Sequence, residues 1–356
     1  MNNLIDINYI NQKDKDLVEI FISSTTRKKY ILGINKLTKS VLKYIKVDGI
    51  IDDFTRVQKS RKKDVLDIED VPKDALILWT STGSPLSVKN RLDKMGLDNF
   101  SYLALSKYSS LNLVAHPFIE DFREDFCNNQ EYYRETFNLL EDEKSKEIFI
   151  KIINFKISYD YGFMEGFIND FEGQYFDKDI VPDIDNIKFL DGGGYVGDTL
   201  PNIIKNYPNF QKIYLVEPNH LHIKIAKRDF GDIDNIEFIE CGLSNRVVNS
   251  SDTMALASSN CNHNFEATSF NTIDNIINSK IDFIKLDIEG AEEDAIEGAK
   301  ETILKYKPIL AICIYHKAED WYRVPQKVLS IDSGYKIYLR HYMEGIFETV
   351  LYFIPK

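Results

Sequence analysis

The chain has 356 residues, 44% of them hydrophobic and 12% aromatic, which is typical of a folded protein with room for two domains and excludes a disordered one. Its 44 Lys and Arg residues stand against 56 Asp and Glu, giving a formal net charge of −12. An acidic surface offers no counterion release to a polyanion, so we expect no nucleic-acid partner.

The cysteines and the amino-terminal sequence indicate the compartment. Cys127, Cys241, Cys261 and Cys313 show no C-x-x-C spacing and are expected to be reduced thiols. The first residues lack a basic region followed by an apolar core, and no apolar run approaches the length of a membrane span. We therefore expect a cytoplasmic protein.

Residues 1–110 predict a small α/β domain. A polar arm is followed by strands expected at 29–33, 47–54 and 75–79, and by helices near 37–44 and at 88–95. Alternation of strands and helices at this length predicts a parallel sheet with helical crossovers. The basic stretch 56–63 lies beside acidic residues and is interpreted as a solvated loop.

Residues 111–180 predict a helical connector. Apolar residues at helical spacing predict a helix over 139–153. The aromatic residues of 157–175 are interpreted as core. Because Gln174 and Tyr175 come shortly before the next strand, this segment is expected to fold back over a bound ligand.

Residues 181–356 have the most regular pattern of the chain. Strands are expected at 187–191, 213–217, 236–240, 282–287, 309–315, 335–342 and 346–354, with helices at 199–206, 219–229 and 291–305. The turn 343–345 joins the last two strands, so a mostly parallel sheet is expected to close with an antiparallel hairpin.

The segment IKFLDGGGYVGD, residues 187–198, predicts a ligand-binding loop. A short apolar strand ends at Asp191, Gly192–Gly194 let a ligand approach the backbone, and Asp198 then begins a helix. This arrangement is typical of a buried parallel strand that is followed by a ligand-binding loop at its carboxyl end. A tight strand-to-helix turn without a ligand is the alternative.

Two ligands fit this loop. Gly192, Gly194 and Gly197 satisfy the dinucleotide pattern G-x-G-x-x-G, and Glu217 follows where an acid would hold a ribose diol. However, Asp191 and Asp198 flank the glycines, and carboxylates suit a cationic ligand better than a pyrophosphate. S-adenosylmethionine, which carries a sulfonium and an ammonium, is therefore favoured.

A second motif, DFIKLDIEGAE, spans residues 282–292 and, like the first, resembles segments of a known family. Together with YLVEPN, KPILAICIYHKAEDWYRVP and YKIYLRHY, these segments resemble the FkbM family of methyltransferases. The resemblance implies a class I methyltransferase fold: a Rossmann-like, doubly wound sheet with a C-terminal antiparallel hairpin, here at 181–356. Dehydrogenase domains generally lack that hairpin.

Residues 1–110 resemble the small nucleotide-binding, Rossmann-like domains found at the N-terminus of some sugar-modifying enzymes. Its first turn, Gly33-Ile34-Asn35-Lys36, has one glycine where two or three are usual. Two alternatives are therefore open: a degenerate domain that kept the fold and lost the ligand, and a domain that still binds a nucleotide.

The FkbM resemblance also implies the cofactor contacts. The loop Gly192–Gly194, continuing through Tyr195, Val196 and Gly197, would face the methionine part of S-adenosylmethionine, with Asp191 near its ammonium. Glu217 would take both ribose hydroxyls, with Pro218 shaping the turn. The residues that would flank the adenine are Cys241, Gly242 and Leu243.

Candidates for the acceptor chemistry follow later strands. Methyl transfer is an in-line displacement, and an alcohol acceptor must also lose its proton. His316 is the first choice as general base, with Glu289, Asp287 and His341 as alternatives. A divalent cation held by Asp287, Glu289 and His316 or His341 is a further alternative. The surface or loop histidines are His116, His220, His222 and His263.

The family implies a methyltransferase acting on a sugar hydroxyl, such as that of a nucleotide sugar or a surface-polysaccharide precursor. Two alternatives remain: an NAD(P)-dependent oxidoreductase, and a non-catalytic docking protein with a degenerate cofactor site. The partner expected is a small acceptor molecule, and a homo-oligomer is left open.

Overall fold

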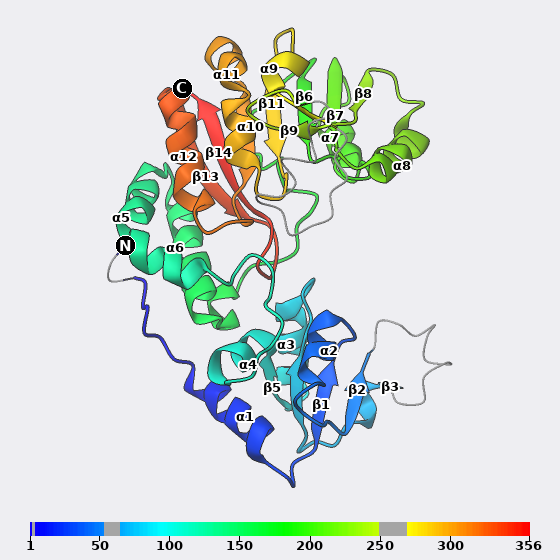
Figure 1. Cartoon of the computed structure of the whole chain (residues 1–356), viewed down its shortest axis with the longest axis vertical. Helices are drawn as coiled ribbons and strands as arrows, with labels where there is room; N and C mark the ends of the chain where they lie inside the picture. The colour runs from blue at the N-terminus through cyan, green and yellow to red at the C-terminus, as the bar shows by residue number, and fades with distance from the viewer. Residues whose placement is uncertain (2–3, 53–64, 249–268) are drawn as a thin grey trace. The chain divides into compact units, whose positions relative to one another are not determined.

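The computed structural model describes residues 1, 4–52, 65–248 and 269–356 (Figure 1). The basic stretch 56–63, the end of the strand expected at 47–54, Cys261 and His263 lie outside the described residues. No described helix is both long and apolar enough to cross a membrane. Two compact units are present: unit 1 comprises Met1–Asn128, Phe149–Asn169 and Tyr342–Phe347, and unit 2 comprises Asn129–Ile148, Asp170–His341 and Glu348–Lys356.

Unit 1 is built on a parallel five-stranded sheet with the order β3-β2-β1-β4-β5. Short runs rich in β-branched and aromatic residues form its strands, and the predicted alternation of strands and helices is confirmed. The strands are β1 (Lys29–Leu32), β2 (Gly49–Ile51), β3 (Val65–Leu66), β4 (Leu76–Trp79) and β5 (Asp98–Ser101), and the helices are α2 (Lys36–Val41), α3 (Pro85–Lys94) and α4 (Tyr102–Tyr108).

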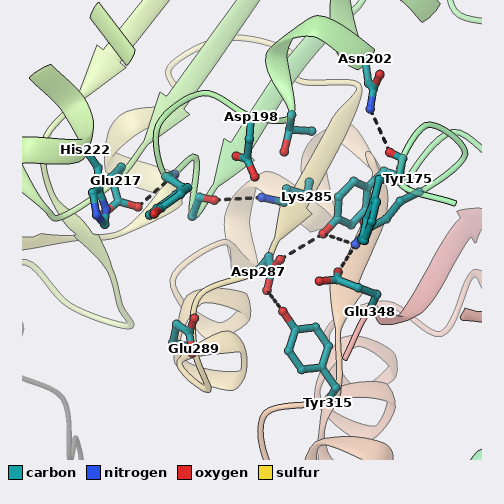
Figure 2. Close-up of a pocket in the computed structure, with 15 residues that line it drawn as sticks. Tyr175, Asp198, Asn202, Glu217, His222, Lys285, Asp287, Glu289, Tyr315 and Glu348 are labelled. Atoms are coloured by element: carbon teal, nitrogen blue, oxygen red, sulfur yellow. Dashed lines mark hydrogen bonds and ion pairs between the residues drawn. The ribbon is translucent and has the colours of Figure 1, made fainter. Parts of the chain in front are cut away.

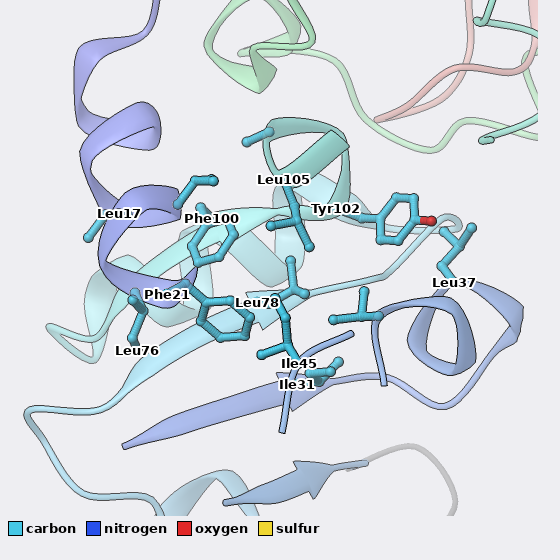
Figure 3. Packing of buried hydrophobic residues seen from close by; sticks show 13 residues of the cluster. Leu17, Phe21, Ile31, Leu37, Ile45, Leu76, Leu78, Phe100, Tyr102 and Leu105 are labelled. Carbon is cyan, nitrogen blue, oxygen red and sulfur yellow. The ribbon is translucent and has the colours of Figure 1, made fainter. Parts of the chain in front are cut away.

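The expected polar arm contains a helix, α1 (Gln12–Ser23). Asn11 caps it by accepting a hydrogen bond from the N–H of Asp14 at 3.1 Å. Leu17 and Phe21, which point from α1 into the core of unit 1, pack with residues such as Phe100 (Figure 3). This helix was not predicted from the sequence, because the many charged residues on its other face make the segment polar on average.

The first turn of unit 1 satisfies its own polar groups. Gly33 has a φ of +111°, and a Cβ there would lie 2.6 Å from Thr80 Oγ1. The Oδ1 of Asn35 accepts from the N–H groups of Leu37 and Thr38 at 2.9 and 3.1 Å, and Thr38 Oγ1 donates to the Gly33 carbonyl at 2.7 Å. The amides at the start of α2, where a phosphate would bind in a nucleotide-binding domain, are thus already bonded.

The predicted connector contains two helices that are divided between the units. Helix α5 (Phe122–Leu139) is interrupted at Asn129, which has a φ of −123° and a ψ of 24°. Helix α6 (Glu143–Ser158) begins later than expected because Leu140 bridges to Ile337 and Asp142 caps the helix by accepting from the N–H of Ser145. A short 3-10 helix, Tyr161–Met164, follows.

Unit 2 is built on a seven-stranded sheet with the order β13-β14-β12-β11-β6-β7-β8. The five strands from β12 to β8 in this order run parallel, and β14 is antiparallel to both β12 and β13. The predicted sheet with its closing hairpin is confirmed. The strands are β6 (Lys188–Gly192), β7 (Lys212–Val216), β8 (Ile236–Ile239), β11 (Phe283–Leu286), β12 (Ile309–Cys313), β13 (Tyr335–His341) and β14 (Thr349–Pro355).

Six helices and a two-stranded sheet complete the described part of unit 2. The helix predicted at 291–305 is divided at Gly298 into two, since glycine is a weak helix former. The helices are α7 (Leu200–Asn206), α8 (His220–Phe230), α9 (Ile273–Ile276), α10 (Glu292–Glu297), α11 (Lys300–Tyr306) and α12 (Asp320–Ile331), and the small sheet pairs β9 (Gly242–Leu243) with β10 (Phe270–Asn271).

Arg340 anchors the start of α6 to β13. Its guanidinium, 3% exposed, lies 2.7 Å from Asp142 Oδ2 and 2.8 Å from Asp177 Oδ2. Burial alone would raise the pKa of Asp142, but the hydrogen bonds from Arg340 and Ser145 outweigh it and lower the pKa to about 2.

We expect Arg340→Met to lower the free energy of unfolding by about 2–4 kcal/mol, since it removes the guanidinium that pairs with two partly buried carboxylates. Urea denaturation of the full-length protein and of the variant measures this difference in the free energy of unfolding. Lys178→Met is the control, because its pair with Asp183 is exposed and contributes little. Equal effects of the two substitutions would contradict the anchoring role.

Candidate functional site

A cavity of about 530 Å³ opens in unit 2 at the carboxyl ends of β6, β7 and β11 (Figure 2). The residues that directly follow these strands, Gly193, Glu217 and Asp287, line it. The described lining also includes Asp198, Glu289 and Glu348, so that five carboxylates face one lysine, Lys285. The two sequence motifs therefore meet at one strongly acidic pocket.

The glycine loop packs against the second motif. Gly193 has a φ of +75°, and a Cβ there would lie 1.8 Å from the carbonyl oxygen of Asp287. The N–H groups of Gly193 and Gly194 donate to the Val216 carbonyl at 2.9 and 3.0 Å. Only glycine allows this approach of the two loops.

Glu217 lines the pocket at the end of β7. Its Oε2 accepts from the N–H of Tyr195 at 3.1 Å, and its Oε1 accepts from the N–H of Asn219 at 2.9 Å and lies 3.2 Å from His222 Nδ1. The His222 ring meets the Tyr195 ring edge to face, with centroids 4.3 Å apart. Glu217 is thus fixed in place with an acceptor group on the cavity wall. His222, expected to be a surface or loop residue, lies in α8 and lines the same wall.

Asp191 has a different place from the one expected for an ammonium contact. Its side chain is fully buried, and Lys285 Nζ lies 2.8 Å from its Oδ1. Lys285 Nζ also donates to the Gly193 carbonyl at 3.0 Å. Burial alone would lower the pKa of Lys285, but Asp191 and Asp287 outweigh it and hold the pKa above its usual value. Of the two aspartates that flank the glycines, Asp198 is the one that lines the cavity.

Asp287 is held from several sides. Tyr315 donates to its Oδ1 at 2.9 Å and Tyr175 donates to its Oδ2 at 3.2 Å (Figure 2). Burial would raise the pKa of Asp287, but the positive charges of Lys285 and His316 outweigh it and lower the pKa. Asp287 is therefore an ionised, well-bonded carboxylate with little basicity.

His316 lies behind the pocket wall, with a side chain only 1% exposed. Its Nδ1 is 3.0 Å from the fully buried Glu292, and its Nε2 is 3.4 Å from Asp287 and 3.9 Å from Glu289. Burial would lower the pKa of His316, but Glu292 and Asp287 outweigh it and raise the pKa to about 9. A protonated imidazole has no lone pair for an acceptor proton, so this environment disfavours the expected role of general base.

The other two expected bases differ from each other. His341 is 7% exposed, its Nδ1 lies 2.9 Å from Thr349 Oγ1 within the hairpin, and it does not line the cavity. Glu289 lines the cavity, and its side chain is 53% exposed.

Backbone strain gathers around the pocket. Nine non-glycine residues in the described ranges have positive φ, and four of them line the cavity. These are Tyr175 at 71°, Tyr195 at 42°, Glu289 at 58° and Glu348 at 63°. Such conformations cost about 1–3 kcal/mol each and are characteristic of functional sites.

The remaining cofactor candidates are divided. Gln174 and Tyr175 of the connector line the cavity, and so does Tyr195 of the glycine loop. Five others do not line it: Gly192 ends β6, and the loop residues are Gly194, Val196, Gly197 and Pro218. Cys241 and Leu243 are buried, with Gly242 between them in β9, and much of the segment that follows, residues 249–268, lies outside the described residues.

Several lining residues were not expected from the sequence. Lys285 had a recognisable signal, because it interrupts an apolar strand two residues before Asp287 and so shares a face with it. Tyr315 and Glu348 gave none, since their roles depend on which strands become neighbours. The others are Phe171, Thr199, Asn202 and His222.

The residues expected to be metal ligands already have partners within the protein. Both Asp287 oxygens accept from tyrosines, and the His316 nitrogens face Glu292 and Asp287. Over the residues that the structure describes, no group of three or more His, Cys, Asp or Glu is arranged to hold a metal ion.

Comparisons with known proteins agree with the resemblance. Residues 185–337 match the methyltransferase FkbM domain. The chain is similar in fold to a methyltransferase FkbM from Methylobacillus flagellatus KT, with a TM-score of 0.76, 21% identity, and coverage of 97% of this chain and 94% of that one. The predicted class I methyltransferase fold is thereby confirmed, and methyl transfer is favoured over the oxidoreductase alternative.

Other similarities cover about half of the chain. An rRNA methylase from Streptococcus thermophilus gives a TM-score of 0.33, 16% identity, and coverage of 49% and 89% of the two chains. Fibrillarin from Aeropyrum pernix, solved with natively bound S-adenosyl-L-methionine, gives 0.33, 13%, and coverage of 49% and 69%. No curated protein matches the chain.

A buried imidazolium should make stability depend on pH. The folded pKa of about 9 lies above the ordinary 6.5, so the contribution of His316 is full below about pH 6.5 and is lost as pH rises through 9. We expect the difference in free energy of unfolding between wild type and His316→Gln to shrink by roughly 3 kcal/mol over this range. Urea denaturation at pH 6 and pH 9.5 measures it.

His220→Gln is the matched control, because the His220 side chain is 68% exposed beside Glu240. Its effect should be small at both pH values. A His316→Gln effect that is independent of pH would show that the ring is neutral in the folded protein.

Proposed function

We propose that the protein is an S-adenosylmethionine-dependent methyltransferase that methylates a hydroxyl group of a sugar. The observation that carries the proposal is the position of Glu217, a fixed carboxylate on the wall of the pocket that the two motifs form. The match to the FkbM methyltransferase domain supports the transferred group, and the sugar acceptor rests on the family resemblance.

The cofactor is proposed to lie along the carboxyl edge of the sheet. Glu217, with His222 and Tyr195 beside it, would accept hydrogen bonds from the ribose hydroxyls. Asp198 would face the ammonium group, and burial raises the pKa of this aspartate so that a cation beside it is favourable. The glycine loop would lie next to the methionine part of the cofactor, which supplies the methyl group on its sulfonium sulfur.

The acceptor is proposed to enter on the side of Asp287, Tyr315 and Glu348, which lies across the pocket from Glu217 in Figure 2. The acidic lining would repel a phosphate, so an uncharged sugar ring should occupy the pocket. Any phosphate of a nucleotide sugar would stay outside. In this arrangement His316 and Lys285 position Asp287, and Asp287 orients the two tyrosine hydroxyls.

Binding of S-adenosylhomocysteine tests the donor site. We expect Glu217→Gln to raise Kd by 10-fold to 100-fold, because hydrogen bonds from hydroxyls to a charged acceptor are worth about 1.5–3 kcal/mol. Isothermal titration calorimetry measures Kd. Glu240→Gln is the control, since Glu240 follows the neighbouring strand and does not line the pocket. Binding of NADH in place of S-adenosylhomocysteine would overturn the proposal.

The transfer itself is tested with a panel of methyl glycosides of glucose, galactose, mannose, rhamnose and fucose, together with the corresponding nucleotide sugars. Mass spectrometry of the products should show a gain of one methyl group. If the methyl glycosides are methylated as efficiently as the corresponding nucleotide sugars, the result agrees with an uncharged ring in the pocket. Binding of the cofactor without any methylated sugar would overturn the acceptor assignment.

Metal removal separates two ways of activating the hydroxyl. Because Asp287 and His316 are committed to tyrosines and carboxylates, we expect methyl transfer to survive dialysis against EDTA. The measurement is transfer of a radiolabelled methyl group before and after dialysis. Activity that is lost and then restored by magnesium or manganese would establish the cation alternative instead.

A further inference from the structure

Glu348 lies at the point where the final strand begins, on the acceptor side of the pocket. It directly precedes β14 and has a φ of 63°, a backbone conformation that glutamate rarely adopts. Its side chain lines the cavity near Asp287 and Tyr175 (Figure 2). Glu348 thus combines a left-handed backbone with a side chain on the pocket wall.

One hydrogen bond orients this carboxylate. Gln174 Nε2 donates to Glu348 Oε2 and to the Tyr175 hydroxyl, the latter at 3.0 Å. Gln174 belongs to the segment before β6, so the last strand and the connector meet at this contact. Within the described part of the chain Gln174 is the hydrogen-bond partner of Glu348, which leaves the carboxylate lone pairs that can accept a hydrogen bond from an acceptor hydroxyl.

We infer that Glu348 is the general base that takes the proton from the acceptor hydroxyl, an assignment that rests on the proposed function. The hydroxyl oxygen forms a bond to the methyl carbon while the carbon–sulfur bond breaks, and that electron pair neutralises the sulfonium. The hydroxyl proton passes to Glu348 and then to solvent. The products are the methyl ether, S-adenosylhomocysteine and one proton.

The other acidic and basic groups nearby are less suited to this role. Asp287 accepts from Tyr175 and Tyr315 and has a lowered pKa, while His316 is buried and protonated. Glu289 lines the pocket, but it is half exposed and keeps its hydration. A base must hold an accessible lone pair near the acceptor, and Glu348 satisfies this condition best.

Burial and the charge of Asp287 raise the pKa of Glu348 to about 7. Such a group is half ionised at neutral pH and binds a proton well when it is ionised, as an efficient base should. The bond from Gln174 and the positive charges of Lys285 and His316 lower the pKa and limit the rise. The titratable and charged groups that face Glu348 are Asp287, Lys285, His316, Tyr175, Cys313 and Tyr315.

The rate of methyl transfer as a function of pH tests the assignment on the panel of methyl glycosides and nucleotide sugars. We expect wild-type kcat/KM to rise with pH up to about 7, as Glu348 loses its proton. Glu348→Gln should lower kcat by 10²-fold to 10⁴-fold, remove this ascending limb, and leave the Kd for S-adenosylhomocysteine within about twofold.

Glu289→Gln is the matched carboxylate substitution, and the ascending limb should remain in that variant. Loss of the limb in Glu289→Gln alone, or full activity in Glu348→Gln, would overturn the inference while the proposed function stands. Wild-type protein that fails to bind S-adenosylhomocysteine, or binds it and methylates no sugar, would instead overturn the proposed function and the inference with it.

Thermal unfolding supplies a measurement that needs no acceptor. The folded pKa of Glu348 is raised above 4.5, so the ionised carboxylate costs stability as pH rises from about 4.5 through 7. We expect Glu348→Gln to unfold at a higher Tm than wild type at pH 8.5 and at a similar Tm at pH 4.5. A lower Tm for the variant at both pH values would make Glu348 a structural residue and overturn the inference.

Discussion

The site depends on the buried ion pair between Lys285 and Asp191. The two residues face each other in neighbouring parallel strands, since Lys285 and Asp191 are register partners of β11 and β6, and their side chains are 3% and 0% exposed. Removing both charges from water is costly, and a close pair recovers that cost only when further polar contacts complete it. The bond from Lys285 to the Gly193 carbonyl is such a contact, so the ion pair also fixes the glycine loop.

The same lysine begins a row of alternating charges that runs from the pocket wall into the protein interior. Lys285 is followed by Asp287, His316 and Glu292, each of which stabilises the charge of its neighbour. This row explains why two of the expected bases are poor ones, because Asp287 is held ionised and His316 is held protonated. It also explains why Glu348 differs, since burial and the negative charge of Asp287 raise its pKa more than Lys285 and His316 lower it. One electrostatic arrangement thus gives neighbouring carboxylates opposite properties.

The sequence was sufficient for features that a single segment encodes. Short apolar runs that end in glycine or acid located the strands, and their chain order with the closing hairpin indicated the class of fold. Helix α1 was missed because its apolar residues Leu17, Val18 and Phe21 occupy one narrow face of a charged segment. Contacts such as Tyr315 with Asp287 or Gln174 with Glu348 join segments more than twenty residues apart. They follow from sheet order and backbone turns, so neither spacing nor residue type along the chain could identify them.

The contrast between the two parallel sheets shows what turns a Rossmann-like edge into a binding site. In unit 1 the polar groups after β1 and β4 bond one another: Asn35 caps α2 and donates to the Thr80 carbonyl, and Thr38 and Thr80 share a hydrogen bond. In unit 2 the corresponding edge has charged groups that its own backbone only partly satisfies, notably Glu217 and Glu348, and these face a cavity. A polar group that keeps part of its bonding capacity toward a cavity favours a ligand, because the ligand completes its hydrogen bonds. The five parallel strands follow the same order in both sheets, and the way that their edge residues are satisfied places the cavity lined by charged groups in unit 2.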